Sequence, residues 1–124
     1  MRIFKNSWIV RFARKEKIGD DILRDAIARA ERGLIDADLG GGLIKQRIAR
    51  VGEGKSGGYR NIIVYKSGSK AFFVFGFAKS ARENLTASEL VAFKQLATKL
   101  LLLTNEELRR QIEDEFLIEV FDNG

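Results

Sequence analysis

Apolar residues recur at helical spacing in two stretches near the N-terminus, after an apolar start at residues 1–4 that predicts a short strand. The first stretch predicts a helix over residues 8–17, with Ser7 as its N-cap. A second helix is expected to open at Asp20, after a break at Gly19, because acidic residues in a first turn suit the helix dipole. The apolar positions of the two stretches are Trp8, Ile9, Phe12, Ala13, Ile22, Leu23, Ala26, Ile27 and Ala30. We expect both to face a core, as an antiparallel helix pair.

The middle of the chain is rich in β-branched and aromatic residues, which predicts three strands over residues 43–51, 59–67 and 70–77. The last of these is apolar enough to be buried on both faces, as a central strand would be. Residues 36–42 contain three consecutive glycines and predict a flexible turn into the first strand. Residues 52–58 contain four glycines and predict a mobile loop that can approach a phosphate closely.

The first of these strands has two different faces. Alternation places Ile44, Gln46, Ile48 and Arg50 on one face and Lys45, Arg47 and Ala49 on the other. The two isoleucines are the expected core anchors. Lys45 and Arg47 then project side by side from the opposite face.

Two capping boxes organise the last third of the chain. Thr86-x-x-Glu89 predicts a helix that ends near residue 103, and Thr104-x-x-Glu107 predicts a short acidic helix that ends near residue 115. Residues 116–121 are apolar and predict a final strand that pairs at a sheet edge or with a partner. The order of elements predicts an α+β fold, and the length of 124 residues predicts one domain.

The chain contains neither Cys nor His, and this excludes whole classes of chemistry. Without Cys, disulfides, thiolate metal sites and cysteine nucleophiles are excluded. Without His, the Ser-His-Asp triad, histidine metal ligands and the usual neutral-pH general base are excluded. We find neither a signal peptide nor a stretch that approaches a membrane span, so a cytoplasmic protein is expected.

The net charge of +5 conceals an asymmetry along the chain. Residues 1–103 carry 20 basic and 10 acidic side chains, whereas residues 104–124 carry two basic and seven acidic ones. Residues 43–82 hold nine Lys or Arg and one acid, Glu53, threaded through the predicted strands. So much like charge in a folded sheet favours an anionic partner, most commonly nucleic acid. The acidic end is either a solvated helix that aids solubility, or a segment that tunes the basic face or binds a partner protein.

Three motifs carry a resemblance to a known family. They are DADLGGG at 36–42, KxRIARxGxGKSGGYR at 45–60 and GFAKSAR at 76–82. In this order they resemble the RelE/HigB group of toxins from bacterial type II toxin–antitoxin modules. The resemblance covers roughly residues 1–103 and leaves residues 104–124 as an acidic C-terminal extension of a single RelE-like domain, 1–124. It implies an N-terminal helix pair packed on a small, twisted, mainly antiparallel sheet, with the C-terminal helices added.

The resemblance also implies a function. Such toxins typically cut mRNA in the ribosomal A site and are neutralised by a small antitoxin, often a helix-turn-helix protein. The basic positions of the family pattern correspond here to Lys45, Arg47, Arg60, Lys79 and Arg82. Two positions that the RelE pattern fills with a basic residue and a tyrosine are Ser80 and Thr86 in this chain.

RNA cleavage by 2′-hydroxyl attack needs a base, cations that stabilise the phosphorane, and an acid for the leaving oxygen. A lysine can be the base where neighbouring cations lower its pKa, which makes Lys45 the candidate base or charge stabiliser. Arg47 and Arg60 are the candidate phosphorane stabilisers, and Lys79 or Arg82 the clamp or acid. Further candidate RNA contacts are Arg50, Lys55, Ser56 and Tyr59. No metal or other cofactor is expected.

Two other functions stay open. One is a protein-binding inhibitor like the related ParE toxins, which poison DNA gyrase. The other is an RNA- or ribosome-binding module that cuts nothing and binds with a steep dependence on salt.

Overall fold

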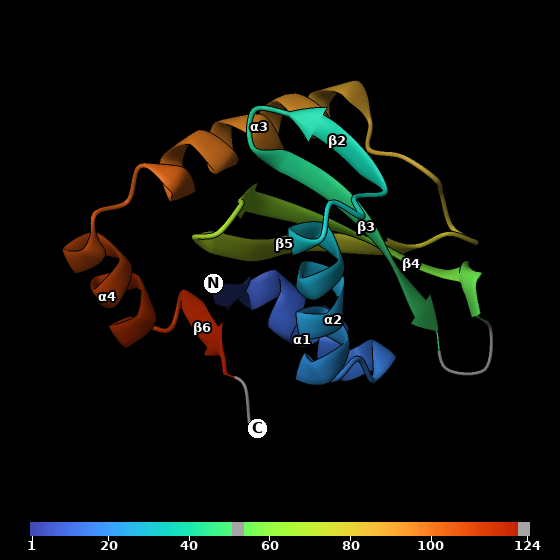
Figure 1. The fold of residues 1–124 in the computed structure, drawn as a ribbon, viewed down its shortest axis with the longest axis horizontal. Coiled ribbons are helices and arrows are strands. Elements are labelled where there is room, and N and C mark those ends of the chain that lie inside the picture. The colour runs from blue at the N-terminus through green and yellow to red at the C-terminus, as the bar shows by residue number, and fades with distance from the viewer. Residues whose placement is uncertain (51–53, 122–124) are drawn as a thin grey trace.

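The computed structural model describes residues 1–50 and 54–121, and of residues 50 and 54–57 the backbone alone. In these described residues, four helices and six strands follow one another (Figure 1). They are β1 (Arg2–Asn6), α1 (Ser7–Glu16), α2 (Asp20–Glu31), β2 (Ala37–Gly40), β3 (Leu43–Arg50), β4 (Gly54–Lys66), β5 (Lys70–Ala78), α3 (Ala87–Leu101), α4 (Asn105–Glu113) and β6 (Leu117–Val120). The predicted α+β class is confirmed.

The six strands form one open sheet in the order β2-β3-β4-β5-β1-β6. All neighbours are antiparallel except β1 and β5, which run parallel with Phe4 opposite Phe72. Figure 1 shows the strands turning relative to one another across the sheet. The mainly antiparallel sheet is therefore confirmed.

Each face of the sheet covers its own apolar core. Ile44, Ile48 and Phe73 face the N-terminal helices, where they meet Leu23 and Ile27 of α2. Within each strand, the alternate residues point to the other side of the sheet and face α3 and α4. Among them are Leu43, Ile62, Val64 and Phe72. The expectation that the strand at 70–77 is buried on both faces is confirmed, because Phe72 and Phe73 are both fully buried. The helix pair packs on the sheet, α1 against β5 and β1 and α2 against β3.

The start of α1 differs from the prediction by one residue. Asn6, not Ser7, is the N-cap, and its Oδ1 accepts a hydrogen bond from the backbone N of Ile9 at 2.9 Å. The same side chain donates through Nδ2 to the carbonyl oxygen of Val74 at 3.0 Å. Asn6 is favoured because it caps the helix and ties the end of β1 to β5 at once. The opening of α2 at Asp20 is as predicted.

The glycine-rich stretch 36–42 is more ordered than the predicted turn. Residues Ala37–Gly40 form β2, an edge strand that pairs with β3 so that Ala37 lies opposite Lys45. The turn itself is confined to Gly41 and Gly42, which have φ values of 63° and 84°. Both φ values lie in the left-handed region, which favours glycine, and a Cβ on Gly42 would also force the end of the Leu101 side chain to move.

The predicted loop 52–58 is also shorter than expected. Strand β4 begins at Gly54, which pairs with Arg50. The register then shifts before Tyr59 pairs with Ile48, so residues 55–58 form an irregular part of β4. Residues 51–53 lie outside the described part of the chain. The prediction of a strand beginning only at Tyr59 was wrong, because backbone pairing with β3 overrides the low strand propensity of glycine.

Both predicted capping boxes are present at α3 and α4, with the threonine hydroxyl and the glutamate carboxylate each accepting a backbone hydrogen bond. The predicted last strand is β6, which pairs antiparallel with β1 at the edge of the sheet. Leu108 and Leu117 are buried in the core on the α3 and α4 side of the sheet, and Val120 is buried in the core under the N-terminal helices, so the acidic end contributes to both cores. No described helix has the length and apolar character needed to cross a membrane.

Candidate functional site

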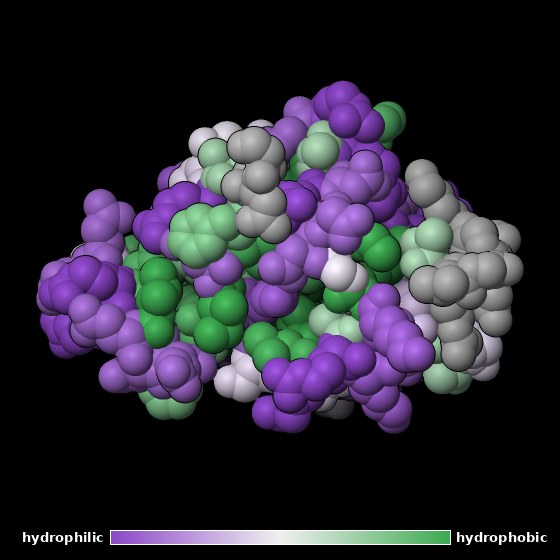
Figure 2. Space-filling view, turned by 90° about the horizontal axis from the view of Figure 1, so that it is seen from below, coloured by the Kyte–Doolittle hydropathy of each residue, from purple (hydrophilic) through white to green (hydrophobic). Residues whose placement is uncertain are grey.

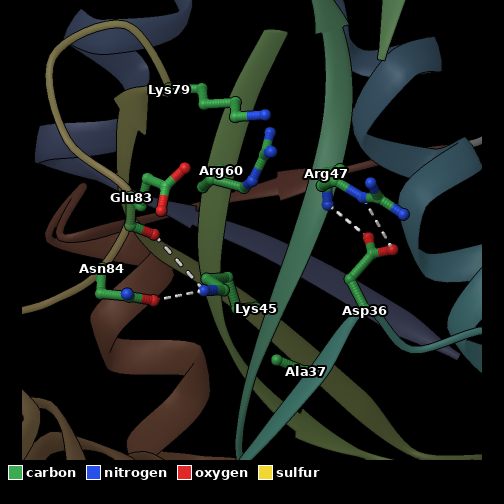
Figure 3. Close-up of a pocket in the computed structure, with 8 residues that line it drawn as sticks. All are labelled: Asp36, Ala37, Lys45, Arg47, Arg60, Lys79, Glu83 and Asn84. Atoms are coloured by element: carbon green, nitrogen blue, oxygen red, sulfur yellow. Dashed lines mark hydrogen bonds and ion pairs between the residues drawn. The ribbon is translucent and has the colours of Figure 1, made fainter. Parts of the chain in front are cut away.

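Two adjacent strands and the segment after β5 bring cationic side chains to one face of the sheet. Alternation places Lys45 and Arg47 of β3 on the face opposite Ile44 and Ile48, as predicted, and this is the α3 side of the sheet. Arg60 of β4 pairs directly with Arg47. Lys79 follows β5, and its backbone N donates to the carbonyl oxygen of Gly58 at 3.0 Å, which holds it beside β4. Together they line a hollow of about 400 Å³, the cationic pocket (Figure 3). Its lining residues are Asp36, Ala37, Lys45, Arg47, Arg60, Lys79, Glu83 and Asn84.

Arg60 is the most unusual member of the cationic pocket. The residue is only 7% exposed, and its Nη1 makes a long hydrogen bond of 3.4 Å to the carbonyl oxygen of Tyr59. Among the described residues, no carboxylate forms an ion pair with its guanidinium. Buried charges in folded proteins are usually paired. Figure 3 shows Arg60 and Lys79 pointing into the same region of the pocket.

The register of the strands also brings two positively charged side chains, Arg47 and Arg60, close enough to repel each other. Arg47 and Arg60 lie directly opposite each other on neighbouring antiparallel strands, so both side chains leave the sheet on the same face. Like charges in such a cross-strand pair destabilise a sheet. An anion bound between them would offset this repulsion. It would also give Arg60 the negatively charged partner that no described carboxylate provides.

Lys45 is positioned by the segment between β5 and α3. Its Nζ donates to Oδ1 of Asn84 at 2.7 Å and lies 3.4 Å from the carbonyl oxygen of Glu83. Both partners are acceptors without a full negative charge. The ammonium is therefore held at the pocket wall with its charge uncompensated by these contacts.

Arg47 is held by Asp36, which lies in the stretch predicted to be a flexible turn. Oδ2 of Asp36 accepts from the backbone N of Arg47 at 2.5 Å, and Oδ1 accepts from its Nε at 3.1 Å. Arg29 of α2 supports the arrangement, donating through Nη2 to the carbonyl oxygen of Arg47 at 2.7 Å. Asp36 therefore fixes the direction of Arg47 and partly neutralises it.

Gln46 fixes Asp36 in turn. Its side chain is fully buried, and Oε1 accepts from the backbone N of Asp36 at 2.8 Å. Its Nε2 donates to the carbonyl oxygens of Ala26 and Leu34 at 2.9 and 3.1 Å. The amide is satisfied at both ends, so it ties the middle of α2 and the segment between α2 and β2 to the strand that carries the cations.

Arg82 does not line the cationic pocket. Its guanidinium binds both carboxylate oxygens of Glu89 at 2.6 and 3.0 Å and lies over the rings of Phe75 and Phe77. The hydrogen bonds from Arg82, followed by that from the backbone of Thr86, lower the pKa of Glu89 to about 2. Thr86, where the RelE pattern has a tyrosine, serves as the N-cap of α3.

Tyr59 faces the other side of the sheet from Arg60. Its ring is 2% exposed, meets Phe12 edge to face with centroids 5.5 Å apart, and its hydroxyl donates to Glu16 at 2.8 Å. Tyr59 is thus placed in the core under the N-terminal helices. The side chains of the other predicted RNA contacts, Arg50, Lys55 and Ser56, lie outside the described residues.

The chemistry of the cationic pocket suits a phosphate. Guanidinium groups bind phosphate oxygens through paired hydrogen bonds, and ammonium groups bind them as point charges. Four cations face the pocket against two acids, Asp36 and Glu83, of which Asp36 is engaged by Arg47. In the described part of the chain, no group of three or more acidic side chains is arranged to hold a metal ion.

Comparison with known families agrees with this fold. The family described as RelE toxin of RelE / RelB toxin–antitoxin system matches residues 1–120. The chain belongs to this family and is a toxin of a toxin–antitoxin system. The match includes α4 and β6, beyond the segment that carried the resemblance in the sequence. A comparison with proteins of curated function finds no match.

Proposed function

We propose that this toxin inhibits translation as a metal-independent endoribonuclease that cuts mRNA on the ribosome, in the cytoplasm. The observation that carries the proposal is Arg60, a buried guanidinium without a carboxylate partner among the described residues, in a pocket that it shares with three other cations. A scissile phosphate supplies the missing negative charge.

In the proposed reaction the 2′-oxygen of the substrate attacks the adjacent phosphorus, and the bond to the 5′-oxygen breaks. Lys45, in its neutral form, takes the proton from the 2′-hydroxyl, or in its charged form stabilises the phosphorane. Arg47 and Arg60 stabilise the negative charge that builds up on the phosphorane oxygens. Lys79 donates a proton to the leaving 5′-oxygen. These roles leave a 2′,3′-cyclic phosphate and a 5′-hydroxyl.

Arg82 is the alternative to Lys79 as clamp or acid. Its two hydrogen bonds to Glu89 favour a role away from the scissile phosphate, since a phosphate would have to compete with that carboxylate. Lys79 lines the pocket and has no ion pair among the described residues. We therefore assign the acid to Lys79 and an outer RNA contact to Arg82.

The antitoxin, proposed to be a helix-turn-helix protein, is expected to cover β6. Phe116 and Phe121 at its two ends are 58% and 65% exposed, and Ile118 between them is also exposed. Figure 2 shows hydrophobic residues gathered on this side of the molecule, next to α4. Replacing Phe116 and Phe121 by Ser should weaken the toxin–antitoxin complex about tenfold or more. Unchanged affinity in a titration would refute this contact and would leave the proposed cleavage untouched.

The test of the function is primer extension on mRNA from cells briefly induced for the toxin, with Arg60→Ala as the control. We expect cuts at codon boundaries in translated messages alone, and their loss in the variant. Intact mRNA with DNA damage would support a gyrase inhibitor of the ParE type instead. Intact mRNA with arrested translation would support a ribosome-binding module that does not cut.

A further inference from the structure

A second hollow adjoins the cationic pocket, on the same side of the sheet. It measures about 230 Å³ and is lined by Leu39, Leu85 and Leu90 together with Lys45 and Asn84. The last two residues also line the cationic pocket, so the two hollows share a wall. The leucines come from β2, from the segment before α3 and from the first turn of α3. We call this hollow the leucine slot.

The orientation of Asn84 follows from its partner. An ammonium group has hydrogen-bond donors and no acceptor, so the atom 2.7 Å from Nζ of Lys45 must be the amide oxygen. The Nδ2 group of Asn84 is therefore turned away from Lys45. Within the described residues Nδ2 donates no hydrogen bond, so its two N–H groups are available to a ligand.

This combination is the one that an unstacked nucleobase requires. The flat faces of a base are apolar and need apolar walls, whereas its edge needs a few well-placed polar groups. A base also lies one sugar away from its own phosphate, which matches a slot that shares a wall with a cationic pocket. An apolar side chain of a protein partner could fill the leucine slot but would leave the neighbouring cations without an anion.

We propose that the leucine slot binds the base of the nucleotide whose phosphate occupies the cationic pocket, and that Asn84 donates through Nδ2 to an acceptor on the edge of that base. The inference rests on the proposed function, because it takes the ligand to be RNA. Asn84 is then a specificity-determining residue, and it also positions Lys45 through its oxygen.

The direct test measures binding of the four nucleoside 5′-monophosphates to the purified toxin, with ribose 5-phosphate as the matched ligand that lacks a base. The best nucleotide should bind about tenfold more tightly than ribose 5-phosphate, as expected for one stacked base. Leu39→Ser should remove most of this difference. Leu102→Ser, which changes a leucine 75% exposed and outside the slot, should preserve it.

Three results would speak against the inference, and they separate it from the proposed function. Equal binding of ribose 5-phosphate and all four nucleotides would overturn the leucine slot but keep the cationic pocket. A preference that Leu39→Ser leaves intact would place the base elsewhere. Failure of all five anions to bind would contradict the slot and the cationic pocket together.

The proposed role of Asn84 in base selection needs a measurement that does not change when only its contact with Lys45 is altered. Asn84→Asp replaces the donor by an acceptor while it keeps an oxygen for Lys45. The variant should therefore redistribute the cleaved codons in a map of cut sites. An unchanged distribution at lower overall cleavage would show that Asn84 only positions Lys45.

Discussion

Arginines occur in two contrasting settings, the cationic pocket and helix α4. Figure 1 shows α4 at one end of the molecule, whereas β3 runs toward the opposite end. In α4, Arg109 is exposed and pairs with Glu106 and Glu113, both at 2.5 Å. In the pocket, Arg60 is buried, faces Arg47 across the ladder and has no carboxylate partner among the described residues. The difference teaches that a cation such as Arg60, buried and without a carboxylate partner among the described residues, is a better candidate for binding an anion than an exposed cation that acids already pair.

The largest expected effect comes from removing one cation from each setting. Arg60→Ala should lower the rate of mRNA cleavage by about 10²- to 10³-fold, as the loss of a preorganised charge stabiliser does. Arg109→Ala should leave the rate unchanged, since its charge is already neutralised by its neighbours. Cleavage in a cell-free translation reaction measures both. Equal losses would mean that total charge, and not the pocket, governs activity.

The next effect concerns the salt dependence of RNA binding. Lys79→Ala removes a pocket cation, so the slope of log affinity against log salt should become shallower by about 0.7, the value for one phosphate contact on single strands. Lys99→Ala, on the exposed surface of α3, should preserve the slope. Titrations at several salt concentrations distinguish the two variants. An identical change of slope in both variants would indicate that RNA is attracted by the overall positive charge and not by the pocket.

A smaller effect is expected from freeing a cation that is paired at present. Asp36→Asn removes the charge that holds Arg47 and keeps an oxygen for its backbone N, so RNA should bind about threefold more tightly. Glu106→Gln makes the same charge change in α4 and frees Arg109 in part. It should not alter binding. An equal gain in RNA affinity in both variants would show that a freed cation attracts RNA equally well in the pocket and in α4.

The smallest effect is on stability in acid. Arg82 and the backbone of Thr86 lower the pKa of Glu89 to about 2. Because the folded-state pKa lies below the unfolded value, the stabilisation is present above about pH 4.5 and is lost as the pH falls toward 2. The melting temperature of Glu89→Gln should therefore depend less on pH in this range than that of the wild type. Parallel curves would show that the pair contributes nothing to stability.

Much of the fold could be predicted because its signals are local. Both capping boxes lie within four residues of sequence, and alternation alone separates Lys45 and Arg47 from Ile44 and Ile48. The N-cap of α1 was missed by one residue, because Asn6 and Ser7 are both good caps and the choice depends on a contact with Val74 far along the chain.

The site was less predictable, because its decisive contacts join distant residues. Asp36 and Arg47 meet only through the β2–β3 hairpin, and nothing near Asp36 in the sequence indicates its partner. Arg82 was grouped with the catalytic cations by its place after β5, but Glu89 and two phenylalanine rings hold it outside the pocket lining. The pairing of Arg60 with Arg47 depends on strand register, which alternation within one strand does not specify.

The central claim is that the cationic pocket itself cuts RNA. The most direct measurement is single-turnover cleavage of an mRNA on purified ribosomes with a defined codon in the A site, with the toxin as the sole addition. We predict a cut within that codon by the wild type, a loss of about 10²-fold or more with Arg60→Ala, and partial recovery with Arg60→Lys. Cleavage by Arg60→Ala at the wild-type rate, or no cleavage by the wild type, would contradict the account.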